Sequence, residues 1–77
     1  AAVKYGISRQ DAYTLVSQMV LGSAKLQLTT GKQPGQLKDE VCSPGGTTIR
    51  GVCALEENGF RNACVKSIDA IMNMKKN

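Results

Sequence analysis

The residues best suited to bind a small anion lie in one short segment, Ser-Pro-Gly-Gly-Thr-Thr, at positions 43–48. Its hydroxyl side chains can donate hydrogen bonds, and its glycines let the backbone approach a ligand closely. If a helix begins at the threonines, the N–H groups of its first turn lack partners within the helix and point toward an anion. The segment therefore predicts a candidate anion site at the start of a helix.

The same residue types also have a purely structural use. Serine and threonine commonly cap helix N-termini, and Ser43, Thr47 and Thr48 stand where such caps are expected. Arg50, one turn into the following helix, could assist an anion or simply face solvent. Without further information, the residues leave the binding and the capping interpretations open.

This chain has few residues that could bind a metal ion. There is no histidine and no CxxC pair, and the three cysteines, Cys42, Cys53 and Cys64, are eleven residues apart. An odd number of cysteines without a secretory signal favours free thiols in a reducing compartment. We therefore expect no metal site, and we expect these cysteines to behave as small buried hydrophobic residues.

Charge and hydropathy argue against nucleic-acid and membrane partners. The net charge is +4, but the ten lysines and arginines are spread along the chain, and only three aromatic residues are available for base stacking. No apolar run approaches the roughly 20 residues that a membrane-spanning helix needs. We expect neither kind of partner.

Helical spacing accounts for the chain on both sides of the glycine loop. Ser8 and Asp11 are typical of a helix start, and we expect a helix over residues 8–30 that ends at Gly31. A short helix is expected from Pro34 to about Val41, because proline fits the first helical position. The first of these helices carries apolar residues at spacings of three and four, which predicts one buried face: Ala12, Leu15, Val16, Met19, Val20, Ser23 and Leu26. Its small residues 22–24 predict close approach by another helix.

Two further helices are expected after the loop. Thr47 or Thr48 is expected to cap the third helix, which ends at Asn58-Gly59. The fourth begins at Phe60 and carries the apolar series Ala63, Cys64, Ser67, Ile68, Ile71 and Met72, with Lys75 and Lys76 at its end, where the helix dipole favours cations.

The expected fold class is all-α, a bundle of about four helices with a glycine-rich loop near its middle. No segment shows the alternation of a strand. A chain of 77 residues is near the lower limit at which one hydrophobic core offsets chain entropy unaided. A partner chain is therefore a reasonable expectation.

Residues 34–69, PGQLKDEVCSPGGTTIRGVCALEENGFRNACVKSID, closely resemble the signature region of pyrroline-5-carboxylate reductases. The segment QMVLGSAKLQL, residues 18–28, also resembles that family's long dimerisation helix. The resemblance implies that residues 1–77 are the C-terminal helical dimerisation and substrate-binding domain, forming an interlocked homodimer that the family commonly builds into larger rings. It also implies reduction of 1-pyrroline-5-carboxylate to proline in proline biosynthesis, with hydride from NADPH or NADH.

The resemblance further implies roles for individual residues. Thr48 would be the catalytic residue whose hydroxyl approaches the ring nitrogen, while Ser43 and the backbone of Gly46 and Thr47 hold the carboxylate. Gly45 belongs to the same binding loop, and Val41 would offer an apolar wall.

The resemblance also implies that an N-terminal dinucleotide-binding domain binds most of the cofactor. This sequence itself has no strand-GxGxxG-helix unit. The segment alone is expected to be inactive, in a cytoplasmic or mitochondrial protein. The alternative is a non-catalytic helical dimerisation or interaction module, in which Ser43→Ala or Thr48→Ala would leave turnover by the full-length protein unchanged.

Overall fold

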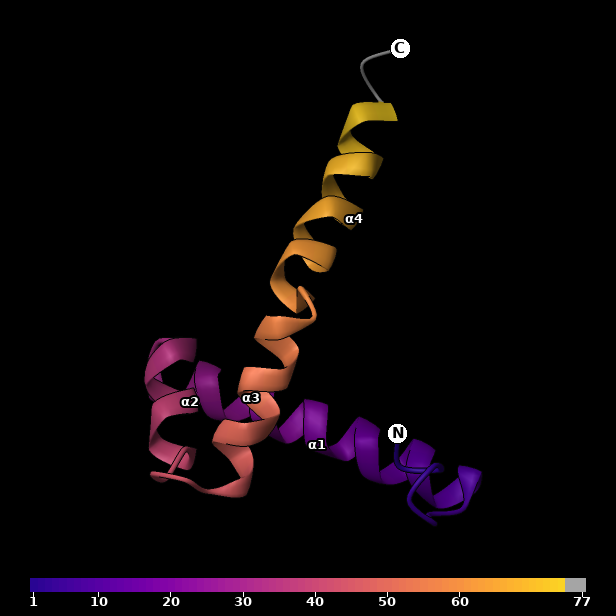
Figure 1. Ribbon diagram of the computed structural model, residues 1–77, viewed down its shortest axis with the longest axis vertical. Coiled ribbons are helices and arrows are strands. Elements are labelled where there is room, and N and C mark those ends of the chain that lie inside the picture. Colours follow the sequence, from indigo (N-terminus) through magenta and orange to yellow (C-terminus); the bar gives the residue numbers. More distant parts are fainter. Residues whose placement is uncertain (75–77) are drawn as a thin grey trace. The chain divides into compact units, whose positions relative to one another are not determined.

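The structure, a computed structural model, describes residues 1–74, and these residues form four helices and no strand. The helices are α1 (Arg9–Thr30), α2 (Pro34–Val41), α3 (Thr47–Glu57) and α4 (Phe60–Met74) (Figure 1). The predicted all-α class, the number of helices and their approximate boundaries are confirmed. The predicted role of Lys75 and Lys76 falls outside the described residues. The chain divides into two compact units, Ala1–Lys38 and a second that begins at Asp39, and each is described by itself.

Both ends of α1 follow from local chemistry that the sequence predicts. Ser8 has an extended backbone, and its hydroxyl oxygen accepts a hydrogen bond from the Asp11 N–H at 3.3 Å. At the other end Gly31 adopts a left-handed φ of 67°, and its N–H donates to the Gln27 carbonyl at 2.9 Å. The Gln27 side chain donates to the Lys32 carbonyl at 3.1 Å, which adds a second tie across the same turn.

Replacing Gly31 by alanine should destabilise the chain, because a side chain at φ 67° costs about 1 kcal/mol. Denaturant unfolding of the full chain at one fixed protein concentration would measure this loss. The matched control is Gly35→Ala in the first turn of α2, where an added Cβ meets nothing within 4 Å and φ is not positive. We expect the control to change the free energy of unfolding by less than about 0.5 kcal/mol. Equal losses of unfolding free energy in the two variants would contradict the proposed role of Gly31 as the C-terminal cap of α1.

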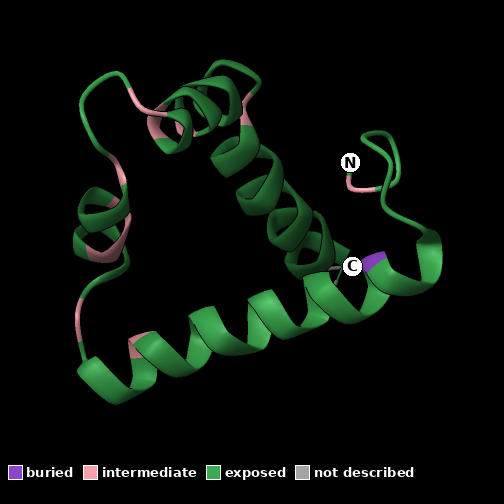
Figure 2. Cartoon of the chain, turned by 90° about the horizontal axis from the view of Figure 1, so that it is seen from below, coloured by how far each residue is buried: buried purple, intermediate pink, exposed green. Residues whose placement is uncertain are grey.

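The apolar face of α1 is not buried within the chain. Ala12 is the one buried hydrophobic residue among residues 1–74, whereas Leu15, Val16 and Met19 are 56%, 45% and 59% exposed (Figure 2). The prediction of a buried face is therefore wrong for a single chain, because within its own unit, Ala1–Lys38, the helix has little else to pack against over most of its length. The stripe itself is present, and its burial requires another surface.

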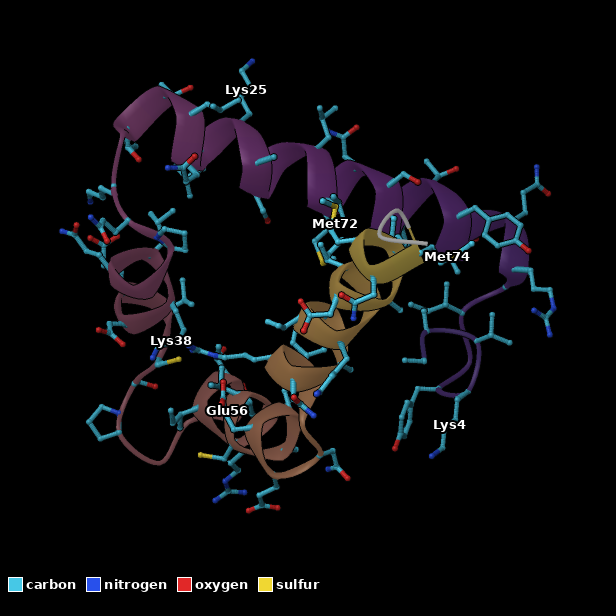
Figure 3. The ribbon with its side chains drawn as sticks, turned by 90° about the horizontal axis from the view of Figure 1, so that it is seen from above. Lys4, Lys25, Lys38, Glu56, Met72 and Met74 are labelled. Atoms are coloured by element: carbon cyan, nitrogen blue, oxygen red, sulfur yellow. The ribbon has the colours of Figure 1, made fainter. Side chains whose placement is uncertain are left out.

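The second unit shows the same exposure. Ile68, Ile71 and Met72 of α4 are all more than half exposed, and the labelled Met72 and Met74 project from its last turn (Figure 3). All three cysteines are free thiols, but Cys53 and Cys64 are exposed and Cys42 is half-buried. The prediction that the cysteines are buried is also wrong within one chain, for the same physical reason.

In the first unit, α2 begins beside the small residues of α1. A groove of ≈ 440 Å³ is lined by Met19, Val20, Ser23, Ala24, Gln27, Pro34 and Leu37. Ser23 and Ala24 leave this space open because their side chains are short. Gly22 does not line this groove, and a Cβ added to Gly22 would meet nothing within 4 Å. None of the helices in the described part of the chain has the length and apolar character of a membrane span.

Candidate anion site at the start of α3

A tight turn connects α2 to α3. The Gly46 N–H donates to the Ser43 carbonyl at 3.0 Å, and Gly45 between them has a φ of 66°. Pro44 at the second position and a glycine with positive φ at the third are the marks of a type II turn. The predicted loop is therefore a defined turn, and Gly45 is a glycine because a side chain would strain this backbone.

Gly46 is the N-cap residue of α3, and Thr47 and Thr48 are its first helical residues. The prediction that Thr47 or Thr48 caps α3 is therefore wrong. The physical reason is the turn, which leaves Gly46 with an extended backbone, φ −77° and ψ 176°, directly before the helix. No side chain caps this end of α3.

The donors at this helix start are the N–H groups of its first turn. By helix geometry the N–H groups of Thr47, Thr48 and Ile49 have no partner within the helix, and the helix dipole is positive here. The Gly46 N–H is different, because it is already used in the turn. Of the backbone donors that the sequence suggested around residues 46–48, the structure therefore leaves those of Thr47 and Thr48 for a ligand.

The predicted site residues lie on one continuous stretch from the end of α2 into α3. Val41 is the last residue of α2 and is 63% exposed, and Ser43, Gly45, Thr47 and Thr48 are exposed as well. Gly46 is half-buried. The structure brings Ser43 directly against Gly46, but it does not enclose the stretch. Walls for a bound ligand would have to come from outside this segment.

Two further features bear on the site's chemistry. Arg50 lies exposed on α3, one turn from the candidate site. Within residues 1–74, no group of three or more His, Cys, Asp or Glu side chains could hold a metal ion. The chemistry available at the start of α3 is therefore hydrogen bonding from hydroxyl and backbone N–H groups.

Sequence reasoning missed the contacts that join α3 to α4. The labelled Glu56 in the last turn of α3 (Figure 3) accepts a hydrogen bond from Arg61 Nε at 2.7 Å, across the Asn58-Gly59 break. At the end of α3 itself, the side chain of its C-cap residue Asn58 donates to the Ala54 carbonyl at 2.8 Å. The sequence signal that could have predicted this ion pair is the opposite charge of Glu56 and Arg61, five residues apart on either side of the helix break. Both partners of the ion pair are at least half exposed, so it orients the corner more than it stabilises it.

Comparison with known proteins gives a consistent result. The family model described as pyrroline-5-carboxylate reductase dimerisation matches residues 1–77. The chain is 54% identical over 72 residues to pyrroline-5-carboxylate reductase of Escherichia coli, covering 94% of this chain and 27% of that protein. It is 52% identical over 68 residues to the Pisum sativum reductase, covering 88% of this chain and 25% of the relative. The chain thus spans about a quarter of the length of these relatives.

A solved structure shows the same fold. The crystal structure of Plasmodium falciparum pyrroline carboxylate reductase with NADP bound matches with a TM-score of 0.85 and 36% sequence identity, over 90% of this chain and 28% of that one. The match of the family model over the whole length, together with these relatives, shows that the chain belongs to the pyrroline-5-carboxylate reductase dimerisation family.

Proposed function

We propose that residues 1–77 are the C-terminal helical domain of a pyrroline-5-carboxylate reductase, which reduces 1-pyrroline-5-carboxylate to proline with NADPH or NADH. The observation that carries the proposal is the family match over residues 1–77. The turn at residues 43–46, which leads into a helix start without a side-chain cap, supports it because this arrangement suits a small carboxylate.

In the proposed site, the first turn of α3 binds the substrate carboxylate. The Thr47 N–H and the Ser43 hydroxyl are suitable donors, and charge-assisted hydrogen bonds of this kind are the stronger ones. Val41 offers an apolar surface to the ring. Because the Gly46 N–H donates within the turn, Gly46 contributes to the shape of the site and not as a free donor.

Thr48 is the proposed catalytic residue. Hydride transfer to a C=N bond requires a polarised nitrogen and fixed geometry more than it requires a strong base. An imine nitrogen that arrives protonated needs only to be oriented, and the Thr48 hydroxyl oxygen can accept its N–H. The absence of histidine from the chain is therefore compatible with this role.

The nicotinamide cofactor supplies the hydride when it is bound, and we assign its binding mainly to a dinucleotide-binding domain outside these residues. The chain has no strand-GxGxxG-helix unit that would hold a dinucleotide. The NADP in the Plasmodium falciparum structure supports a nicotinamide cofactor for this family member. The choice between NADPH and NADH would be made in that other domain, and the three free thiols fit a reducing compartment, cytosolic or mitochondrial.

We also propose that the functional form is a homodimer. The apolar stripes of α1 and α4 are largely exposed in a single chain, and a second copy would cover them. The open stretch at residues 41–48 would then gain walls from the partner copy and from the cofactor-binding domain.

Turnover is the direct test. Full-length protein containing this chain should oxidise NADPH or NADH and form proline when 1-pyrroline-5-carboxylate is supplied. The isolated 77-residue chain is the control and should give no turnover, because it lacks a dinucleotide-binding unit. A folded, dimeric full-length protein with no turnover would refute the reductase assignment and leave a non-catalytic helical dimerisation module.

A further inference from the structure

The two glycines of the turn are required for opposite reasons. Gly45 has a φ of 66°, and a Cβ added there would meet nothing within 4 Å, so its requirement is conformational. Gly46 has φ −77° and ψ 176°, which alanine adopts freely. Its backbone conformation therefore does not explain a glycine at this position.

Space explains it. A Cβ on Gly46 would collide with the Ser43 hydroxyl oxygen, far inside the separation that real Cβ atoms keep, and would lie 3.2 Å from the Ser43 carbonyl oxygen. The Ser43 hydroxyl thus occupies the space that a side chain on residue 46 would fill. Since Gly46 is the N-cap residue of α3, the hydroxyl lies at the N-terminal end of that helix, where the first N–H groups have no partner within the helix.

We infer that Gly46 is a positioning residue for substrate binding that acts through Ser43, by leaving the space in which the Ser43 hydroxyl joins the first turn of α3. The inference rests on the proposed function, in which that hydroxyl binds the substrate carboxylate. A methyl group at residue 46 would turn the hydroxyl away, because rotation about one bond is the cheapest relief of the collision. The substrate would then lose one donor, while the Ser43–Gly46 backbone hydrogen bond remains after the Ser43 carbonyl oxygen shifts a few tenths of an ångström away from the new methyl group.

A double-mutant cycle tests this coupling in the full-length reductase. Ser43→Ala and Gly46→Ala should each raise KM for 1-pyrroline-5-carboxylate about tenfold, as expected for loss of one hydrogen bond to a charged group. Each should change kcat by less than about twofold. The Ser43→Ala/Gly46→Ala variant should be no worse than Ser43→Ala alone, because the hydroxyl is already gone. Gly35→Ala, with open space at its Cβ, is the matched control and should leave KM unchanged.

Additive effects, about a hundredfold in KM for the double variant, would overturn the inference, as would an unchanged KM in Gly46→Ala. A crystal structure of Gly46→Ala separates this inference from the reductase assignment. The Ser43 hydroxyl displaced from residue 46 supports the geometry whatever the substrate is, and an undisplaced hydroxyl refutes it. If Gly46→Ala does not fold, rescue of folding by Ser43→Ala supports the collision, and failure of the double variant as well overturns it.

Discussion

Thr48→Ala in the full-length reductase is expected to lower kcat/KM for 1-pyrroline-5-carboxylate at least tenfold. Thr48 is exposed in the first turn of α3, so removing its hydroxyl leaves no cavity in a core. The proposed loss is the acceptor that fixes the ring nitrogen for hydride transfer, and a tenfold decrease corresponds to about 1.4 kcal/mol of transition-state stabilisation. Steady-state rates at saturating NADPH, with substrate concentration varied, would measure the effect.

The matched control is Thr48→Ser, which keeps the hydroxyl and removes only the methyl group. We expect it to retain most of the activity. Both variants should be compared at equal dimer content, because loss of the dimer would lower activity for another reason. Wild-type turnover in a folded, dimeric Thr48→Ala variant would remove Thr48 from the mechanism, even with the reductase assignment intact.

Val16→Asp is expected to weaken the proposed dimer at least about a hundredfold. Val16 lies within the apolar stripe of α1, between Ala12 and Met19. In a dimer, the new carboxylate would be taken out of water without a partner, at each of two equivalent places in the interface. Anchoring residues at the centre of an interface commonly contribute 2–4 kcal/mol, roughly 30- to 1,000-fold in affinity. Sedimentation of the full-length protein across a dilution series would measure the change in dissociation constant.

Thr14→Asp provides the control for the added charge. Two helical positions correspond to a rotation of about 200°, so Thr14 lies on the side of α1 opposite Val16. The same carboxylate placed there should stay in water and leave dimerisation nearly unchanged. If the two variants dissociate equally, the stripe that contains Val16 is not the dimer surface, and another face of α1 must carry it.

The helix boundaries were predictable because the signals that set them are local. Ser8, Gly31 and Pro34 each act through their own backbone angles or through a bond to a near neighbour, so residue type alone carries the information. The predicted cap of α3, Thr47 or Thr48, is one or two residues later than the observed cap, Gly46. Threonine and glycine are about equally suited to the N-cap position. The hydrogen bond from the Gly46 N–H to the Ser43 carbonyl sets where the chain becomes helical, and residue type does not reveal that bond.

Burial was not predictable from this sequence. The stripe of α1 satisfies the helical pattern, yet a pattern states only which side avoids water and not which chain covers it. The candidate site shows a similar division. The sequence reveals the hydroxyls and glycines of residues 43–48. Only the three-dimensional structure shows that the Gly46 N–H donates within the turn and that the Ser43 hydroxyl fills the space beside the Gly46 α-carbon.

With Ala12 as the one buried hydrophobic residue among residues 1–74, a single copy contains almost none of its own core. In the proposed dimer, folding is then a second-order process, and thermal stability should rise with protein concentration. Damage to the apolar stripes would therefore remove the fold and the dimer together, instead of leaving a folded single copy.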